Sequence, residues 1–229
     1  NGNTNNGTNY QYTVLGGASA VTIHPTFPID EDNVIVTFDA TGTALAGATK
    51  VYLHAGVSAT QSNPQTFQYT KGNWGQDDGI GQMTNVSGNI WTITLSTLRT
   101  YFNVPEEKDV FGLNLLLRNA NGTLKEDLGG DNYYFAVNPG SYFTITAPVF
   151  DLTFVENGQS LNHTATANVA PTTWTLKQID ATTGVDLSTI QTQSGGTTFS
   201  HVLPVVDTYL KKYKLIADFG GTIKYKTFK

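Results

Sequence analysis

Short runs of β-branched and aromatic residues, separated by turn residues, recur along most of this 229-residue chain. In the first part they read AVTIHP, NVIVTFDA, TKVYLHAG, TFQYTKG, IWTITL, VFGLNLLLRNA and DNYYFAV. Stretches rich in glycine and asparagine, such as ATGTALAGA, NVSGN and LGGDN, lie between them. This alternation predicts antiparallel β-strands, and RNANGTLKED predicts a hairpin around Asn121-Gly122. Only residues 96–107 suggest a helical turn, which Ser96 can cap and Pro105 follows.

A domain boundary is predicted at NPGSY (residues 138–142), because Asn-Pro-Gly interrupts regular structure. A second series of runs follows: YFTITAP, DLTFVE, LNHTATANV, TTWTLKQI, STIQTQ, TTFSHVL, KYKLIADF and TIKYKTF. About seven short strands at this spacing are typical of an immunoglobulin-like sandwich. We therefore predict an all-β chain with two tandem β-sandwich, immunoglobulin-like domains, at residues 20–138 and 139–229. We expect the polar residues 1–19 to form a linker.

The composition limits the class of partner. Charged residues are 14% of the chain, against about 25% in an average globular protein. The net charge is −5, and an acidic surface repels phosphate backbones, so we expect no nucleic-acid partner. There is no cysteine, so disulfides and thiolate metal sites are excluded. No apolar run is long enough to predict a membrane span.

Sequence patterns for catalysis and cofactor binding are weak. The chain contains no G-x-S-x-G and no H-E-x-x-H, and its four histidines are scattered. GIGQMT lacks the third glycine of a dinucleotide-binding loop. Asp30, Asp32 and Asn33 could bind calcium, but they lack the spacing of a calcium-binding helix–loop–helix and read more simply as a turn. The carboxylates that could form a glycosidase pair lie mostly in turns: Asp77, Asp78, Glu126, Asp127 and Asp131. We therefore expect no catalytic residues, no metal and no cofactor.

VYLHAG (residues 51–56) instead suggests a binding surface. Side chains alternate faces along a strand, so Tyr52 and His54 share one face. Trp74 follows in the glycine-rich stretch GNWGQDDGIG, where a tryptophan is more often presented than buried. Aromatic rings at an angle can stack on the C–H faces of sugars. The alternatives are that Tyr52 and His54 face the core, or that the strand is buried on both faces; Trp91 and Trp174 are predicted to be core residues.

These residues carry a family resemblance. The stretch from VYLHAGV through GNWGQDDGIGQMTNVSGNIWTITL to GGDNYYFAV resembles the starch-binding modules of carbohydrate-binding families 25 and 26. It is especially similar to versions that precede α-amylases, or occur in surface glycan-binding proteins, of Bacteroidetes. The resemblance covers roughly residues 20–138 and implies starch-type α-1,4-glucan as ligand. It matches Tyr52 and His54 to the family's strand pair and Trp74 to its loop tryptophan.

The segment between the strand pair and the tryptophan is longer here than in that family, which makes Tyr69 an alternative to Trp74. GGDNYY (residues 129–134) matches the family's late turn. From their positions, we expect four polar residues to bind sugar hydroxyls: Lys71, Gln76, Asp77 and Asn132.

We therefore predict a non-catalytic polysaccharide-binding protein. We expect a monomer that is part of a larger multidomain protein, secreted or on the outer-membrane surface of a Gram-negative bacterium. Three rival hypotheses remain open. The domains could be structural spacers or an adhesin stalk. The chain could be a small jelly-roll hydrolase or lyase. The surface could bind another glycan, such as β-glucan, chitin or xylan.

Overall fold

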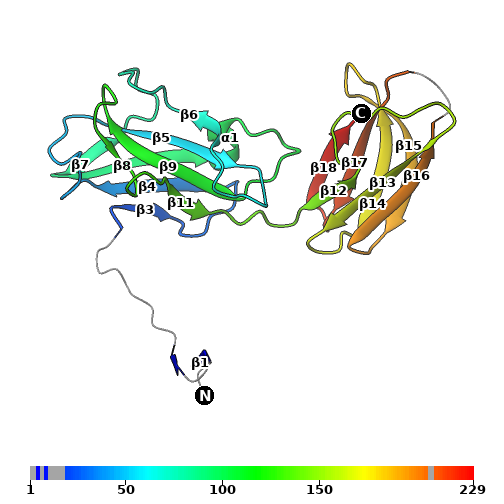
Figure 1. Cartoon of the computed structure of the whole chain (residues 1–229), viewed down its shortest axis with the longest axis horizontal. Helices are drawn as coiled ribbons and strands as arrows, with labels where there is room; N and C mark the ends of the chain where they lie inside the picture. Colours follow the sequence, from blue (N-terminus) through cyan, green and yellow to red (C-terminus); the bar gives the residue numbers. More distant parts are fainter. Residues whose placement is uncertain (1–3, 6–7, 10–18, 206–208) are drawn as a thin grey trace.

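The structure is a computed structural model that describes residues 4–5, 8–9, 19–205 and 209–229. Most of the predicted linker at residues 1–19 lies outside the described residues. Within it, β1 (Thr4–Asn5) and β2 (Thr8–Asn9) pair with each other. From residue 20 onward the chain forms two β-sandwiches side by side, joined by one connection between β11 and β12 (Figure 1). The prediction of an all-β chain with tandem sandwiches is confirmed.

The first sandwich contains two antiparallel sheets. One has the order β3 (Val21–His24), β4 (Asn33–Asp39), β8 (Ile90–Thr97), β7 (Thr84–Ser87). The other has the order β10 (Lys125–Glu126), β9 (Gly112–Asn119), β5 (Val51–Ser58), β6 (Gln68–Lys71), with β11 (Tyr133–Ala136) also paired to β9. Aliphatic residues at every second position of β4, β5 and β9 form the core between the sheets, and Trp91 is buried there as predicted.

A short helix, α1 (Leu98–Phe102), follows β8. Its N-cap is Thr97, whose hydroxyl accepts a hydrogen bond from the Thr100 amide at 3.3 Å. The prediction of Ser96 as the cap was wrong by one residue, because β8 runs on to Thr97. Leu98 and Phe102 are buried, so the helix closes one end of the first core.

The second sandwich packs a three-stranded sheet on a four-stranded one. The orders are β12 (Phe143–Ala147), β13 (Ser160–Ala167), β16 (Thr198–Pro204) and β15 (Asp186–Ser194), β14 (Thr173–Ile179), β17 (Lys212–Asp218), β18 (Ile223–Phe228). Trp174 is fully buried, as predicted, with ring centroids 5.2 Å from Phe143 and 5.9 Å from Phe199. The predicted strand DLTFVE (residues 151–156) does not form, and the segment is irregular.

None of the helices within the described part of the chain is long and apolar enough to cross a membrane.

His163 gives the second sandwich a pH dependence. It is buried on β13, with ring centroids 5.3 Å from Tyr213 and 4.8 Å from Phe228. Burial lowers the pKa of His163 to about 4, and neighbouring His201 acts in the same direction, while the Leu161 carbonyl 3.2 Å from Nδ1 opposes them. The unfolded chain, with a histidine pKa of about 6.5, therefore takes up a proton first as the pH falls. The buried, neutral His163 therefore makes its full contribution to stability above about pH 6.5. This contribution is lost progressively as the pH falls toward 4.

We expect His163→Phe to remove this dependence. Between pH 7 and 4.5, wild-type stability should fall by about 2 kcal/mol more than that of the variant, because about 1.4 kcal/mol accompanies each pH unit between the two pKa values. Urea unfolding at both pH values measures this. Carboxylates contribute equally to both proteins, so an identical loss in both would exclude His163 as the cause.

Candidate functional site

Strand β5 places its aliphatic and aromatic side chains on opposite faces. Val51, Leu53, Ala55 and Val57 belong to the core between the two sheets, as the alternation predicts. The side chains at Tyr52 and His54 therefore lie on the outer face of the sheet. Only part of this face is open to solvent. Tyr52 and His54 differ in exposure, and the candidate site lies at the exposed end.

Tyr52 is 0% exposed, because the glycine-rich segment 72–82 folds back over it. The segment joins the edge of β5, with the Leu53 amide donating to the Gly81 carbonyl at 2.8 Å. A Cβ at Gly81 would lie 2.2 Å from the Leu53 carbonyl oxygen, so only glycine permits this approach. The Tyr52 hydroxyl hydrogen-bonds the Asp77 carboxylate and lies 3.1 Å from Gln82 Oε1. The prediction of Tyr52 as a stacking ring for a sugar was therefore wrong.

Arg118 fixes this covering segment to the sheet. It lies opposite Tyr52 on β9, fully buried, with its guanidinium carbon 4.5 Å from the centroid of the tyrosine ring. Nη2 donates to the carbonyls of Asn73 at 2.8 Å and Gln76 at 2.9 Å. Nη1 donates to the carbonyls of the two residues after Arg118, both at 2.9 Å. The residues on either side of Trp74 are thus attached to the sheet by one side chain.

Arg118 was not predicted from the sequence. The signal was present, because GLNLLLRN carries a single charge at a position that faces away from the core. A buried arginine needs several acceptors, and here they are carbonyls from a segment about forty residues earlier in the chain. No sequence spacing predicts that contact.

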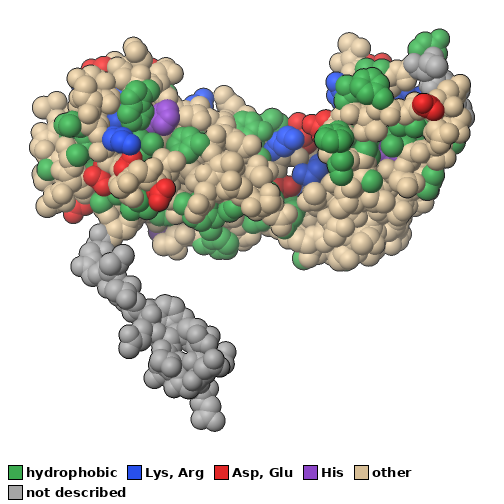
Figure 2. Space-filling view, viewed as in Figure 1, with side chains coloured by type: hydrophobic (Ala, Val, Ile, Leu, Met, Phe, Trp, Pro, Cys, Tyr) green, Lys and Arg blue, Asp and Glu red, His purple; other side chains and the backbone are tan. Residues whose placement is uncertain are grey.

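Three rings meet beside the covering segment 72–82, which we call the cover. The His54 ring lies 5.6 Å from the Trp74 ring, with an interplanar angle of 89°. On its other side it stacks on Phe67 at 5.7 Å and 12°. Trp74 is 47% exposed, whereas His54 and Phe67 are half-buried. Figure 2 shows histidine and hydrophobic side chains meeting at the surface of this domain, with Lys or Arg side chains beside them. We call Phe67, His54 and Trp74 the aromatic corner.

The aromatic corner is uncharged at neutral pH. Burial lowers the pKa of His54, and the positive charge of Arg118 acts in the same direction, while the Gly72 backbone opposes them. The imidazole is therefore neutral and keeps one nitrogen as an acceptor. Phe67, which sequence analysis did not select, precedes β6 and lies over Gly56, where a Cβ would stand 3.0 Å from its ring.

The predicted polar contacts fall into two groups. Gln76 is exposed beside Trp74, and half-buried Lys71 ends β6 opposite Ala55. Asp77 already has two partners, the Tyr52 hydroxyl and Lys50 Nζ at 2.7 Å. The Lys50 hydrogen bond, followed by that of Tyr52, lowers the pKa of Asp77. Asp77 therefore attaches the glycine-rich segment 72–82 to Tyr52 and Lys50.

The last two predicted residues lie apart from the corner. Asn132 is exposed just before β11. Because β9 lies between β5 and β11, Asn132 is two strand spacings, or about 10 Å, from His54. Tyr69 packs against the first core with φ of 50°, so the suggestion that it replaces Trp74 as the exposed ring was wrong.

The proposed calcium ligands have structural partners. The buried Asp30 carboxylate hydrogen-bonds Arg99, and Asp32 Oδ2 accepts from the Ile29 amide at 2.9 Å. Across the described parts of the chain, no cluster of three or more His, Asp or Glu side chains could hold a metal ion.

Comparison with known proteins adds one match. Residues 21–126 are similar to a family described as a domain of unknown function, DUF8578. The match covers β3 to β10, including the whole aromatic corner and Arg118, and stops before the second sandwich. No curated protein matches the chain. The description of the family names no ligand or activity, so the resemblance to starch-binding modules remains a prediction.

Proposed function

We propose that the first sandwich binds a polysaccharide without catalysing a reaction, and that starch-type α-glucan is its ligand. The observation that carries the proposal is the geometry of the aromatic corner. Trp74 stands half-exposed and perpendicular to His54 on a segment that Arg118 holds in place. An exposed ring set at an angle to its neighbour suits a curved glucan, whereas a flat array of rings would suit a straight chain.

The rigidity of the corner also supports binding. Binding normally costs the entropy of ordering side chains and loops, and a preorganised site avoids much of that cost. Covering roughly 60–90 Å² of apolar ring surface contributes about 1.5–2.3 kcal/mol per stacked sugar at ~25 cal/mol per Å². Affinity for one short chain is therefore expected in the micromolar to millimolar range.

The carboxylates nearest the corner favour binding over hydrolysis. The Asp78 carboxylate accepts from Asn73 Nδ2 at 2.7 Å and from the Ile80 amide at 2.9 Å, and these hydrogen bonds lower its pKa. The pKa of Asp77 is lowered as well. A glycosidase general acid needs a raised pKa, so this pair lacks the property that would support an enzyme.

A structural spacer is the second candidate, and the burial of Tyr52 is the observation that favours it. A spacer needs no exposed ring in a fixed position. Trp74 therefore decides between the two functions.

Affinity electrophoresis tests the proposal and the choice of glycan. The protein is run in native gels that contain amylopectin, laminarin, xylan or chitosan, beside a reference protein that binds none of them. We expect amylopectin alone to retard it. Retardation only by laminarin, xylan or chitosan would replace starch by that glycan, and unchanged mobility in every gel would leave the spacer as the better account.

A further inference from the structure

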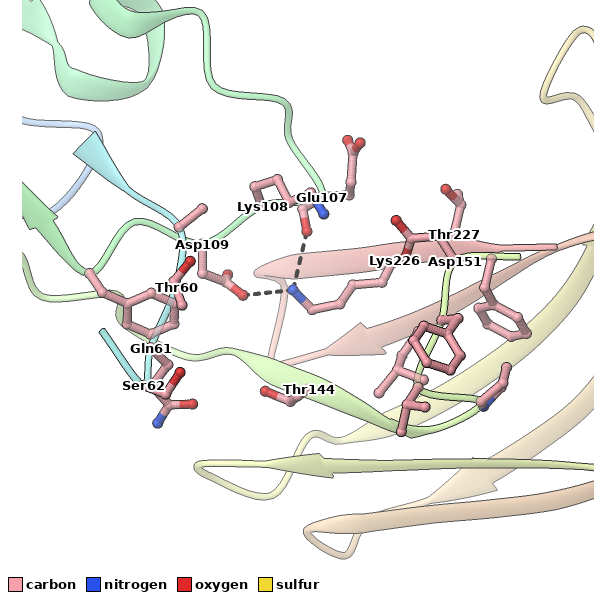
Figure 3. A pocket seen from close by; sticks show the side chains of 17 residues that line it. Thr60, Gln61, Ser62, Glu107, Lys108, Asp109, Thr144, Asp151, Lys226 and Thr227 are labelled. Carbon is pink, nitrogen blue, oxygen red and sulfur yellow. Dashed lines mark hydrogen bonds and ion pairs between the residues drawn. The ribbon is translucent and has the colours of Figure 1, made fainter. Parts of the chain in front are cut away.

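A hollow lies between the two sandwiches, and none of its lining residues belongs to the aromatic corner. It has a volume of about 590 Å³, within the usual range of roughly 300–1,000 Å³ for small-molecule sites. Its walls come from both domains. Segments 59–62 and 107–111 of the first sandwich face β12, segment 148–151 and the end of β18 in the second (Figure 3). We call it the interdomain cleft.

The back of the cleft is an ion pair between the domains. Lys226 Nζ on β18 lies 2.9 Å from Asp109 Oδ2 and donates to the Glu107 carbonyl at 3.2 Å. Lys224 Nζ lies 3.7 Å from the same carboxylate. Asp109 is buried between these two lysines. The lining also carries Glu107, Lys108 and Asp151, so three carboxylates and three lysines surround the cleft and a ligand meets little net charge.

Two further contacts hold the walls in position. The Tyr142 ring packs edge-on against Phe111 at 5.3 Å, and Gln61 Nε2 donates to the Tyr142 hydroxyl at 2.6 Å. Together with the ion pair, they connect the first domain to the second at several points. The cleft is thus formed before any ligand arrives.

Besides its charged groups, the lining of the cleft contains neutral polar side chains and an exposed ring. Phe150 is 70% exposed, on a segment next to the paired backbone of Asp151 and Lys229. The neutral hydroxyl and amide side chains of the lining are Thr60, Gln61, Ser62, Thr144 and Thr227. An apolar ligand would cover hydroxyl groups without giving them partners, and an anion would meet the carboxylates of Glu107, Asp109 and Asp151 as well as the lysines. A sugar matches both features, since its C–H face can cover the ring while its hydroxyls bond the rim.

We infer that the interdomain cleft is a second carbohydrate site, which binds one or two units of the same neutral glycan. This inference rests on the proposed function of the first domain. A polymer that reaches both sites binds the second one intramolecularly, so its apparent affinity exceeds that for a short oligosaccharide. The second sandwich then supplies one wall of a carbohydrate site.

Phe150→Ala tests the inference, with Phe154→Ala as the matched control. Both rings are exposed, so neither variant should unfold, but Phe154, at 89% exposure, lies outside the cleft. Affinity for amylopectin should fall at least about tenfold in Phe150→Ala and stay unchanged in Phe154→Ala. The binding of maltotriose is followed in parallel through backbone amide shifts.

We expect maltotriose to shift the amides of Gln61, Ser62 and Thr227 in the wild type and in Trp74→Ala, and to leave them unmoved in Phe150→Ala. Shifts confined to the aromatic corner, with equal amylopectin affinity in both phenylalanine variants, would overturn the second site and leave the proposed function intact. An absence of shifts at both places would overturn both proposals.

Discussion

Trp74→Ala should weaken binding to amylopectin by about tenfold to fiftyfold. The indole is the most exposed ring of the aromatic corner. A sugar stacked on a half-exposed indole covers roughly 60–90 Å² of apolar surface. At ~25 cal/mol per Å², the loss is about 1.5–2.3 kcal/mol. Affinity electrophoresis at several amylopectin concentrations gives the ratio of dissociation constants directly.

Ile80→Ala is the control for this variant. Ile80 is an exposed apolar residue of the same covering segment, outside the three rings. We expect it to bind like the wild type, and both variants to unfold at the wild-type temperature. If Trp74→Ala keeps the wild-type affinity, the aromatic corner does not contact the glycan.

Arg118→Met should strongly destabilise the first sandwich. Methionine fills much of the space of the arginine stem but removes the guanidinium donor from four carbonyls. Those of Asn73 and Asn119 keep a backbone N–H donor, whereas those of Gln76 and Ala120 lose the donor that Arg118 supplies. An unsatisfied buried acceptor costs about 1–3 kcal/mol, and opening of the segment to water relieves part of the total. We expect a net loss of about 2–4 kcal/mol in the free energy of unfolding, measured by urea titration.

The matched control is Lys125→Met on the strand beside Arg118. Lys125 lies opposite Arg118, and its exposed side chain forms an ion pair with the mostly covered Asp127, which contributes about 1 kcal/mol. Arg118→Met should also weaken glycan binding although Arg118 is buried away from solvent, because it releases the segment that carries Trp74. Equal stability of the two variants would show that Arg118 does not hold the cover.

Strand periodicity predicted the faces of β5 correctly because it depends only on local geometry and on the cost of exposing leucine. It could not predict that segment 72–82 covers Tyr52. That arrangement depends on the close packing of Gly81 against the Leu53 carbonyl, and on hydrogen bonds from Arg118 to carbonyls far away in the sequence. The same limit explains why His54 and Tyr52, two positions apart, differ in exposure. His54 lies where the cover ends, and its ring is flanked by Phe67 and Trp74.

The failed strand at DLTFVE has a similar cause. Its alternating apolar residues satisfy the strand pattern, yet Leu152 and Phe154 are exposed. The Thr153 amide bonds the Lys229 carbonyl, which attaches the segment beside the end of β18 and not within a sheet. Alternation alone cannot show whether a neighbouring strand edge is available. Trp91 and Trp174 were easier to assign, because each lies in a run whose neighbours also face a core.

The indole N–H signals of the three tryptophans test the central claim most directly. Trp91 and Trp174 are buried in separate cores, so only Trp74 can touch a ligand at the aromatic corner. In a titration with maltoheptaose, the signal that is missing from Trp74→Ala should move in a saturable way, while the other two stay in place. A ligand that leaves the Trp74 signal unmoved at saturating concentration would contradict sugar binding at the aromatic corner.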